Sequence, residues 1–269
     1  MKQRYQRVAI LGVDGGGAFF SQAQTPCMDQ LFAHGATTYR AVTSIPTISA
    51  ECWGSMLLGV EPEKHGLTNE IVSLRPYDPL SPYPSVFRLA RAAFPAAQLA
   101  SFCNWNPINS GIIEEDLGVY KDTADSDAAV CEKVLAYLAN NDPTLLFVQF
   151  DEVDGAGHKF GYGAALYLEK IAEIDALIGA IAAAYQEKGW ANDTLFIVSA
   201  DHGGNPLHGH GGDSDAEKLI FTGCAGRDIR HGEIEDMRVR DIAAITAEAL
   251  GLTAPAAWTG QVPAGIFSC

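Results

Sequence analysis

Short apolar runs alternate with stretches of helical periodicity along almost the whole chain. Apolar runs of strand length predict β-strands at residues 7–13, 38–44, 97–103, 144–150, 194–200 and 218–224. Helical spacing of apolar positions predicts helices at residues 18–34, 49–58, 84–94, 126–140, 161–188 and 239–250. This alternation is typical of an α/β fold with a largely parallel central sheet and helices on both of its faces.

The length and composition favour one domain. The chain has 269 residues, of which 48% are hydrophobic, so it is long enough to bury one sizeable core. Residues 70–125 are richer in proline and aromatic side chains, and we expect them to shape a pocket wall without forming a separate cap domain. No linker, repeat or low-complexity tract divides the sequence. We therefore expect a single domain over residues 1–269.

The charge and the first residues of the chain exclude some partners. The formal net charge is −15, which disfavours binding of nucleic acid through its phosphates, so a small phosphate ligand would need local cations. The start, MKQRYQRVAILGVDGGG, holds an apolar run too short for a signal peptide or a membrane span. We expect a cytoplasmic protein with no membrane partner. Its six cysteines include no Cys-x-x-Cys pair, and we expect them to be reduced and mostly buried.

Aspartates follow three of the expected strands. Asp14 comes directly after residues 7–13, Asp154 shortly after residues 144–150, and Asp201 directly after 194–200. One such aspartate is often only a helix cap. Ligands of open α/β sheets bind outside the carboxyl ends of the strands, so three aspartates at these positions, two of them near histidines, indicate a ligand site.

The histidines near these aspartates extend the candidate site. DEVDGAGHKFG places Asp154 four residues before His158, and SADHGGNPLHGHGGDSDAE places Asp201 beside His202 and adds His208 and His210. Carboxylate and imidazole ligands without thiolates suit Zn²⁺, Mn²⁺ or Fe. The six candidates are too many for one tetrahedral ion and suit two: Asp14, Asp154, His158, Asp201, His202 and His210. His208, in the same loop as His210, remains an alternative ligand.

Ser49 is the candidate nucleophile. In PTISAECWGSMLLG it stands where a proline-bearing segment gives way to a helical pattern, so backbone N–H groups and the helix dipole would favour an anion beside it. The alternative is that Ser49 only caps the helix. A nearby dinuclear metal site favours the catalytic role, because metal coordination can make a serine hydroxyl nucleophilic near neutral pH.

Taken together and in this order, the motifs resemble the alkaline phosphatase superfamily, particularly its type I phosphodiesterase / nucleotide pyrophosphatase branch. The resemblance runs from ILGVDGGG through TISAECWGSMLLGVEPEKHGLTN, DEVDGAGHKFG and SADHGG to RVRDIAAITAEALGL. It implies an alkaline-phosphatase-like fold in which Ser49 is the nucleophile and a ligand of the first metal. It assigns Asp14, Asp201 and His202 to that first metal and Asp154, His158 and His210 to the second. It also implies that Asn69 contacts a phosphate oxygen.

The function that the resemblance implies is a metal-dependent phosphodiesterase or nucleotide pyrophosphatase. The substrate would be a small phosphate ester or a nucleotide, hydrolysed through a phosphoseryl intermediate. The cofactors would be two divalent ions, with Zn²⁺ favoured and Mn²⁺ or Fe as alternatives. The aromatic stretch around Phe102 and Trp105 is a candidate wall for the leaving group, with ordinary packing as the alternative.

Departures from the family pattern keep other activities open. The phosphodiesterases usually carry Thr-Phe-Pro-Asn at the nucleophile, whereas this chain has Ser49-Ala50-Glu51-Cys52, closer to phosphomonoesterases. The alternatives are therefore a phosphomonoesterase, a phosphonate hydrolase or a phosphomutase of the superfamily. The Cys-x-Pro-x-Arg motif of sulfatases does not occur. A non-catalytic metal-binding protein is disfavoured because all six ligands and the serine are present.

Overall fold

The computed structural model describes residues 2–268 and is built around one eight-stranded sheet. The strand order in the sheet is β4-β3-β5-β1-β6-β7-β2-β8. The strands are β1 (Arg7–Val13), β2 (Ala36–Val42), β3 (Gln98–Cys103), β4 (Tyr120–Thr123), β5 (Pro143–Phe150), β6 (Thr194–Ala200), β7 (Leu219–Ala225) and β8 (Gly232–Glu233).

The sheet is mostly parallel, as its alternating pattern predicts. β1 pairs in parallel with β5 on one side and with β6 on the other. β7 is the exception, because it runs antiparallel to both β6 and β2. β2 consequently points in the same direction as β1. Every residue of β1 is buried, as expected of a central strand covered on both faces.

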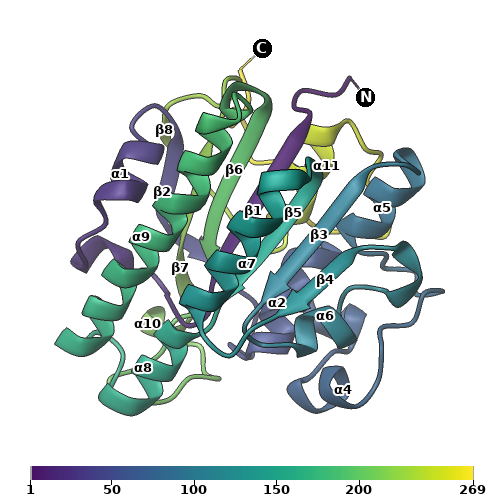
Figure 1. Cartoon of the computed structure of the whole chain (residues 1–269). Helices are drawn as coiled ribbons and strands as arrows, with labels where there is room; N and C mark the ends of the chain where they lie inside the picture. Colours follow the sequence, from purple (N-terminus) through teal and green to yellow (C-terminus); the bar gives the residue numbers. More distant parts are fainter. Residues whose placement is uncertain (1, 269) are drawn as a thin grey trace.

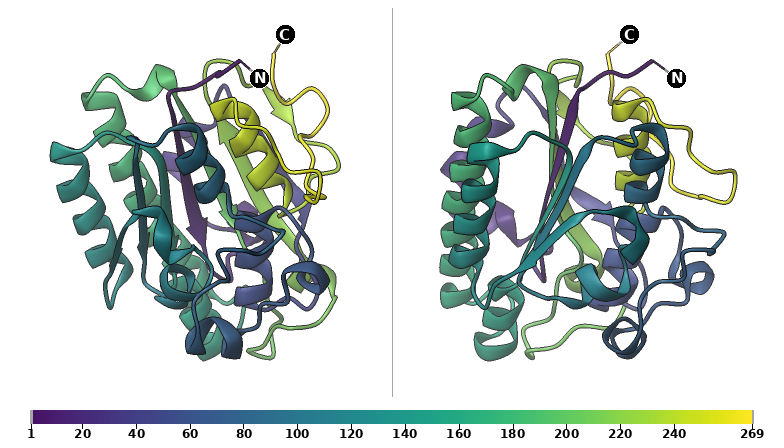
Figure 2. Two further views of the ribbon diagram at one scale, coloured as in Figure 1. Left: turned by 90° about the vertical axis from the view of Figure 1, so that its right-hand side faces the viewer. Right: turned by 45° about the vertical axis from the view of Figure 1, so that its right-hand side comes forward.

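Helices cover both faces of the sheet, so the molecule has three layers (Figure 1). The helices α1 (Pro26–Leu31), α7 (Asp127–Asn140) and α9 (Ala165–Glu187) pack together on one face, and α2 (Ser49–Leu58), α5 (Val86–Ala93) and α11 (Asp241–Leu250) on the other (Figure 2). Shorter helices are α3 (Pro62–His65), α4 (Asn69–Leu74), α6 (Pro107–Gly111), α8 (Glu152–Phe160) and α10 (Asp215–Lys218). Short 3₁₀ turns occupy Phe19–Gln22, Glu115–Leu117 and Ala191–Asp193.

The six expected strands are all present, each within two residues of its expected bounds. The sequence analysis missed β4 and β8, which are short and carry no apolar run. The helix expected at residues 18–34 is instead a 3₁₀ turn and α1, which starts at Pro26 because proline cannot donate a hydrogen bond inside a helix. Residues 152–160 form a helix despite Gly155 and Gly157.

The free thiols mostly fill the interior, as expected. Cys52, Cys103, Cys131 and Cys224 are buried and Cys27 is half-buried, and no cysteine of residues 2–268 forms a disulfide. Cys269 lies outside the described residues. Within that described range, no helix combines the length and the apolar character that crossing a membrane requires.

The carboxyl ends of the parallel strands gather the chemistry-bearing residues at one edge of the sheet. β1, β5 and β6 all point toward the lower end of the molecule in Figure 1, where α4 and α8 also lie. Asp14 follows β1, α8 follows β5 after one residue, and Asp201 follows β6. β2 runs in the same direction, so the segment leading to α2 also starts from this edge.

A close approach between β1 and α2 fixes the height of α2 above the sheet. Gly12 lies on β1 directly under the ring of Trp53, and a Cβ atom added at Gly12 would stand 2.4 Å from Trp53 Cη2. Only glycine leaves room for the indole at this point. The same indole donates a hydrogen bond to Asp14, so this contact links the core to the candidate site.

We expect Gly12→Ala to lower the free energy of unfolding by about 1–3 kcal/mol, because the added methyl group collides with Trp53 inside a packed core. Gly155→Ala is the matched control. A Cβ at Gly155, on α8, would meet nothing within 4 Å, so alanine should stabilise the helix by about 0.5–1 kcal/mol. Urea denaturation of the purified variants measures both changes, and equal stability of Gly12→Ala and the wild type would contradict the contact.

Candidate active site

Ser49 is the first residue of α2 and does not cap it. The N-cap is Ile48, and no side chain makes a capping hydrogen bond there. The Ser49 Oγ instead lies 3.5 Å from Asp14 Oδ1 and 3.3 Å from His202 Nε2. Ser49 is buried, with 9% of its surface exposed. The hydroxyl therefore faces a carboxylate and an imidazole at the carboxyl ends of β1 and β6.

Asp14 is held by two side chains from different elements. Its Oδ2 accepts hydrogen bonds from Trp53 Nε1 at 2.9 Å and from Gln149 Nε2 at 3.2 Å. Neither donor is a backbone N–H group, so Asp14 is not a helix cap. Because both donors bind Oδ2, Oδ1 is left to face Ser49 and His202 Nε2, the latter at 3.4 Å.

Asp201 is fully buried and has one oxygen without a hydrogen bond. Its Oδ1 accepts from the backbone N–H groups of Gly15 and His202, at 3.0 and 2.7 Å. Its Oδ2 lies 3.4 Å from His202 Nε2 but has no hydrogen-bond partner. Leaving a buried carboxylate oxygen unpaired is costly, so a cation at this position would stabilise the arrangement. Asp14, Asp201 and His202 offer ligand atoms that all lie within 4.8 Å of one another.

A second group lies on α8 and on the loop before α10. Asp154 and His158 are four residues apart on α8, so they share one face of that helix. Asp154 Oδ2 lies 3.1 Å from His158 Nε2, and His158 Nε2 lies 3.2 Å from His210 Nε2. The Tyr162 hydroxyl donates to Asp154 Oδ1 at 2.5 Å. These ligand atoms of Asp154, His158 and His210 also lie within 4.8 Å of one another.

These two sets of candidate metal ligands, called the ligand groups, adjoin each other. The first ligand group is Asp14, Asp201 and His202, and the second is Asp154, His158 and His210. The rings of His202 and His210 are stacked with their centroids 4.1 Å apart. A Cβ atom on Gly15, the neighbour of Asp14, would stand 2.4 Å from Asp154 Oδ1, and Gly15 has a positive φ of 65° that favours glycine. Glycine at this position lets the carboxylate of the second group pack against the turn that follows β1.

The imidazoles of the three histidines in the two ligand groups are oriented in the same way. The Nδ1 of His158, His202 and His210 lies 2.9, 2.9 and 2.7 Å from the backbone oxygens of His208, Gly203 and Thr47. A carbonyl can only accept, so Nδ1 carries the proton and Nε2 is left as a lone-pair donor. Metal-binding histidines are commonly held in this way. The Nε2 atoms of all three rings face the carboxylates or each other.

His208 has a supporting position outside both groups. Its side chain is exposed, and its Nδ1 lies 3.1 Å from the backbone oxygen of His158. Its own backbone oxygen accepts the Nδ1–H of His158. The structure therefore brings His210 and not His208 into the second group, and His208 contacts the site through its main chain.

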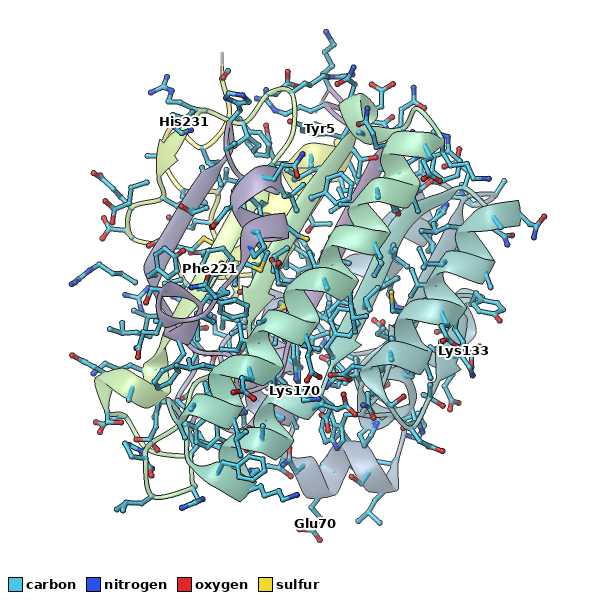
Figure 3. All side chains as sticks on the ribbon, turned by 60° about the vertical axis from the view of Figure 1, so that its left-hand side comes forward. Tyr5, Glu70, Lys133, Lys170, Phe221 and His231 are labelled. Carbon is cyan, nitrogen blue, oxygen red and sulfur yellow. The ribbon has the colours of Figure 1, made fainter. Side chains whose placement is uncertain are left out.

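No lysine or arginine of the described residues forms an ion pair with the aspartates of the site. Within residues 2–268, the ion pairs of Asp14, Asp154 and Asp201 involve histidines only. Lys133 on α7 and Lys170 on α9 instead pair with Asp122 and with Glu152 and Glu173 on the outside of the molecule (Figure 3). The three aspartates thus form a local concentration of charge that favours bound cations.

Burial opposes ionisation of Asp14, Asp201, His202 and His210. Burial, with repulsion from Asp201 and Asp154, raises the pKa of Asp14 well above its usual range. Burial also raises the pKa of Asp201, and the nearby Asp154 adds to the shift. Burial lowers the pKa of both His202 and His210. Neutral imidazoles are ready to donate lone pairs, and a divalent cation would offset the cost of ionising the two carboxyl groups.

The expected phosphate contacts at the start of α2 are partly occupied by protein groups. Asn69, the first residue of α4, accepts the backbone N–H of Ala50 through Oδ1 at 2.9 Å. This contact leaves the Asn69 Nδ2 as the donor that it can offer to a ligand. Glu51 is buried, its Oε2 has no hydrogen-bond partner, and burial raises its pKa. This carboxyl group occupies the position where the phosphodiesterases usually carry proline.

One residue expected to line the pocket lies away from the site, and three residues that hold its aspartates were not predicted from the sequence. Phe102 is buried against Tyr137 and Tyr120, so it does not form a pocket wall. The sequence analysis did not identify Trp53, Gln149 or Tyr162. A signal was available for Gln149, which is the single polar side chain in the apolar run LLFVQF.

Part of the chain is similar in sequence to a much longer transferase. Over 96 residues the chain is 32% identical to GPI ethanolamine phosphate transferase 2 of Aspergillus fumigatus, which covers 36% of this chain. The chain spans only 12% of the length of that relative.

Solved structures share the fold at low sequence identity. A 2-O GAG sulfatase superposes with a TM-score of 0.79 at 13% identity, covering 96% of this chain and 73% of the sulfatase. Inactive murine ectonucleotide pyrophosphatase / phosphodiesterase 5 in complex with AMP superposes with a TM-score of 0.74 at 15% identity, covering 94% of this chain and 96% of the other. Both share the alkaline-phosphatase-like fold.

A family model supplies the broadest match. The model described as type I phosphodiesterase / nucleotide pyrophosphatase matches residues 8–248, which include Ser49 and all six candidate ligands. Members of the alkaline phosphatase superfamily use divalent metals, and the two ligand groups fit that chemistry. The chain therefore belongs to the type I phosphodiesterase / nucleotide pyrophosphatase family of the alkaline phosphatase superfamily.

Proposed function

We propose that this chain is a metal-dependent phosphodiesterase or nucleotide pyrophosphatase that hydrolyses small phosphate esters through a phosphoseryl intermediate. The observation that carries the proposal is the position of the Ser49 hydroxyl. It lies 3.3 Å from His202 Nε2 and 3.5 Å from Asp14 Oδ1, within one ligand group that is stacked against the second. The family match and the AMP complex of the similar murine protein support a phosphate ester or nucleotide as substrate.

The proposed cofactors are two divalent ions, with Zn²⁺ favoured and Mn²⁺ or Fe as alternatives. Asp14, Asp201 and His202 would hold one ion, with Ser49 as a further ligand, and Asp154, His158 and His210 would hold the other. The unpaired Asp201 Oδ2 and the oriented Nε2 atoms fit such ions. When bound, the ions supply the positive charge that favours the serine alkoxide and offsets the charge of the phosphoryl oxygens.

The protein residues provide the nucleophile and its orientation. Ser49 Oγ gives up its proton and forms a bond to phosphorus while the bond from phosphorus to the leaving oxygen breaks, and that oxygen departs with its alcohol or nucleotide group. Water then cleaves the bond between Ser49 Oγ and phosphorus, which releases the phosphate product and restores the serine hydroxyl. Asn69 Nδ2 would donate to a nonbridging oxygen of the substrate, because Oδ1 is already engaged with Ala50. Trp53 and Gln149 keep Asp14 Oδ1 turned toward the nucleophile by holding Oδ2.

A phosphotransferase is the second candidate function. The identity to a GPI ethanolamine phosphate transferase favours it, although that relative is far longer than this chain. The two activities would share a phosphoseryl intermediate and differ only in whether water or an alcohol accepts the phosphorus-containing group from Ser49. Product analysis with and without an added alcohol acceptor separates them.

Replacing the nucleophile is the direct test of the proposed function. We expect Ser49→Ala to lower kcat/KM for bis-p-nitrophenyl phosphate, assayed with Zn²⁺ or Mn²⁺, by about 10³-fold or more, because no other group can form the covalent intermediate. The wild type should turn over this diester faster than p-nitrophenyl phosphate. The reverse preference would favour the phosphomonoesterase alternative.

Ser55→Ala provides the matched control. Ser55 is also a buried serine of α2, but its hydroxyl bonds Ser44 Oγ and lies near His65 Nε2, away from both ligand groups. Its loss should lower stability and leave kcat unchanged. If the wild type turns over neither ester with any added metal, and Ser49→Ala behaves like Ser55→Ala, the enzymatic proposal fails.

Two histidine variants test the second ligand group. We expect His210→Ala to reduce the bound Zn²⁺ from two ions per chain to one, since only Asp154 and His158 would remain. His208→Asn should keep both ions, because its main-chain oxygen still accepts the Nδ1–H of His158 and asparagine tolerates the φ of 68°. Elemental analysis after reconstitution and desalting measures both, and well under one ion in the wild type would contradict the site.

A further inference from the structure

Thr47 connects the nucleophile segment to the loop that carries His210. It is fully buried and stands two residues before Ser49. Its hydroxyl donates to the backbone oxygen of Gly212 at 3.0 Å and accepts the backbone N–H of Gly211 at 2.8 Å. Its own backbone oxygen accepts the Nδ1–H of His210 at 2.7 Å. All three hydrogen bonds thus reach consecutive residues of one loop.

The Thr47 hydrogen bonds attach the His210 loop, residues 205–212, on the side that faces Ser49. Two further attachments lie elsewhere on the loop. Glu217 Oε1 accepts the N–H of Gly212 at 3.0 Å, and His208 is hydrogen-bonded to His158 on α8. Residues 206–208 of the loop are exposed, with Leu207 at the tip 88% exposed, whereas residues 205 and 209–211 are half-buried. His208 and Gly211 have positive φ angles of 68° and 112°. Thr47 is therefore the attachment that holds the main chain next to His210 on the side of the nucleophile, while His208 holds the loop on the side of α8.

Burial makes the Thr47 contacts strong and sensitive to substitution. With 0% of Thr47 exposed, water cannot replace either of the hydrogen bonds made by its hydroxyl. Removing the hydroxyl would leave the N–H of Gly211 and the C=O of Gly212 without these partners. The loop would then relax so that both groups reach water, and His210 would move with it.

We propose that the Thr47 hydroxyl is a positioning group that fixes the His210 loop against the segment leading to Ser49. It thereby sets the second ligand group at a defined place relative to the nucleophile. The ligand role of His210 rests on the proposed function, whereas the attachment of the loop does not. The hydrogen bonds of Thr47 reach His210, Gly211 and Gly212 and not Ser49, so it acts on the site through His210.

Three variants separate this role from a general loss of stability. Thr47→Val removes the hydroxyl with little change of shape and keeps the backbone oxygen that accepts from His210. Thr47→Ser restores the hydroxyl. Thr194→Val is the control, because Thr194 is equally buried, donates to Trp190 O at 2.9 Å, and lies at the opposite end of β6 from Asp201.

The first measurement uses metal-free protein. Thr47→Val should speed amide hydrogen exchange at Gly211 by about tenfold or more, since its N–H loses its buried acceptor. Thr47→Ser and Thr194→Val should exchange at this amide like the wild type. Unchanged exchange in Thr47→Val would overturn the proposed attachment, whether or not the protein binds metals.

The second measurement is Zn²⁺ affinity by competition with a chelator. Thr47→Val should lower the affinity for the ion at Asp154, His158 and His210 by about 10–100-fold, the usual effect of losing a hydrogen bond that orients a metal ligand. The affinity for the other ion should not change. Thr47→Ser should restore the affinity. Faster exchange together with unaltered affinity for both ions would reduce Thr47 to a structural role and overturn the proposal. A wild type that binds no Zn²⁺ would instead contradict the proposed function.

Discussion

Uncompensated negative charge is the constraint on which the arrangement of this site depends. Asp14, Asp154 and Asp201 meet at the carboxyl edge of the sheet, and their ion pairs within residues 2–268 are with histidines only. Burial raises the pKa of Asp14 and of Asp201, so ionising them without a cation is costly. The site has the composition expected of a cation-binding centre, and an acidic protein could attract an anionic substrate through such cations.

The parallel strands explain why residues so far apart in the chain converge. β1 lies between β5 and β6, and each of the three strands delivers one aspartate at or just beyond its carboxyl end. α8 then adds His158 one turn after Asp154, and the loop before α10 adds His210. The glycines at positions 12 and 15 permit the close packing of Trp53 and of Asp154 that this convergence needs.

The sequence predicted most of the elements and the residues of both ligand groups, because these signals are local. Apolar runs marked six of the strands, and the aspartates and histidines stand directly after strands in short motifs. The hydrogen-bond donors to Asp14 could not be predicted from the sequence, since Trp53 and Gln149 come from other elements and meet Asp14 only in the folded chain. Only the resemblance, through the residues GGDSDAE that follow His210, favours it over His208, because neither side chain is marked by burial or periodicity in the sequence. The sequence analysis did not predict the helix at residues 152–160, where Gly155 and Gly157 weaken the helical propensity.

The common orientation of the three imidazoles has a consequence for the cost of ligand binding. His158, His202 and His210 each have Nδ1 anchored on a main-chain oxygen, so their rotational freedom is lost when the chain folds and not when a ligand arrives. The entropic cost of ordering the rings therefore lowers the free energy of unfolding and does not lower the affinity for a ligand. An ion entering the site would meet a preorganised set of lone pairs, and its intrinsic affinity would not be reduced by the need to arrange them.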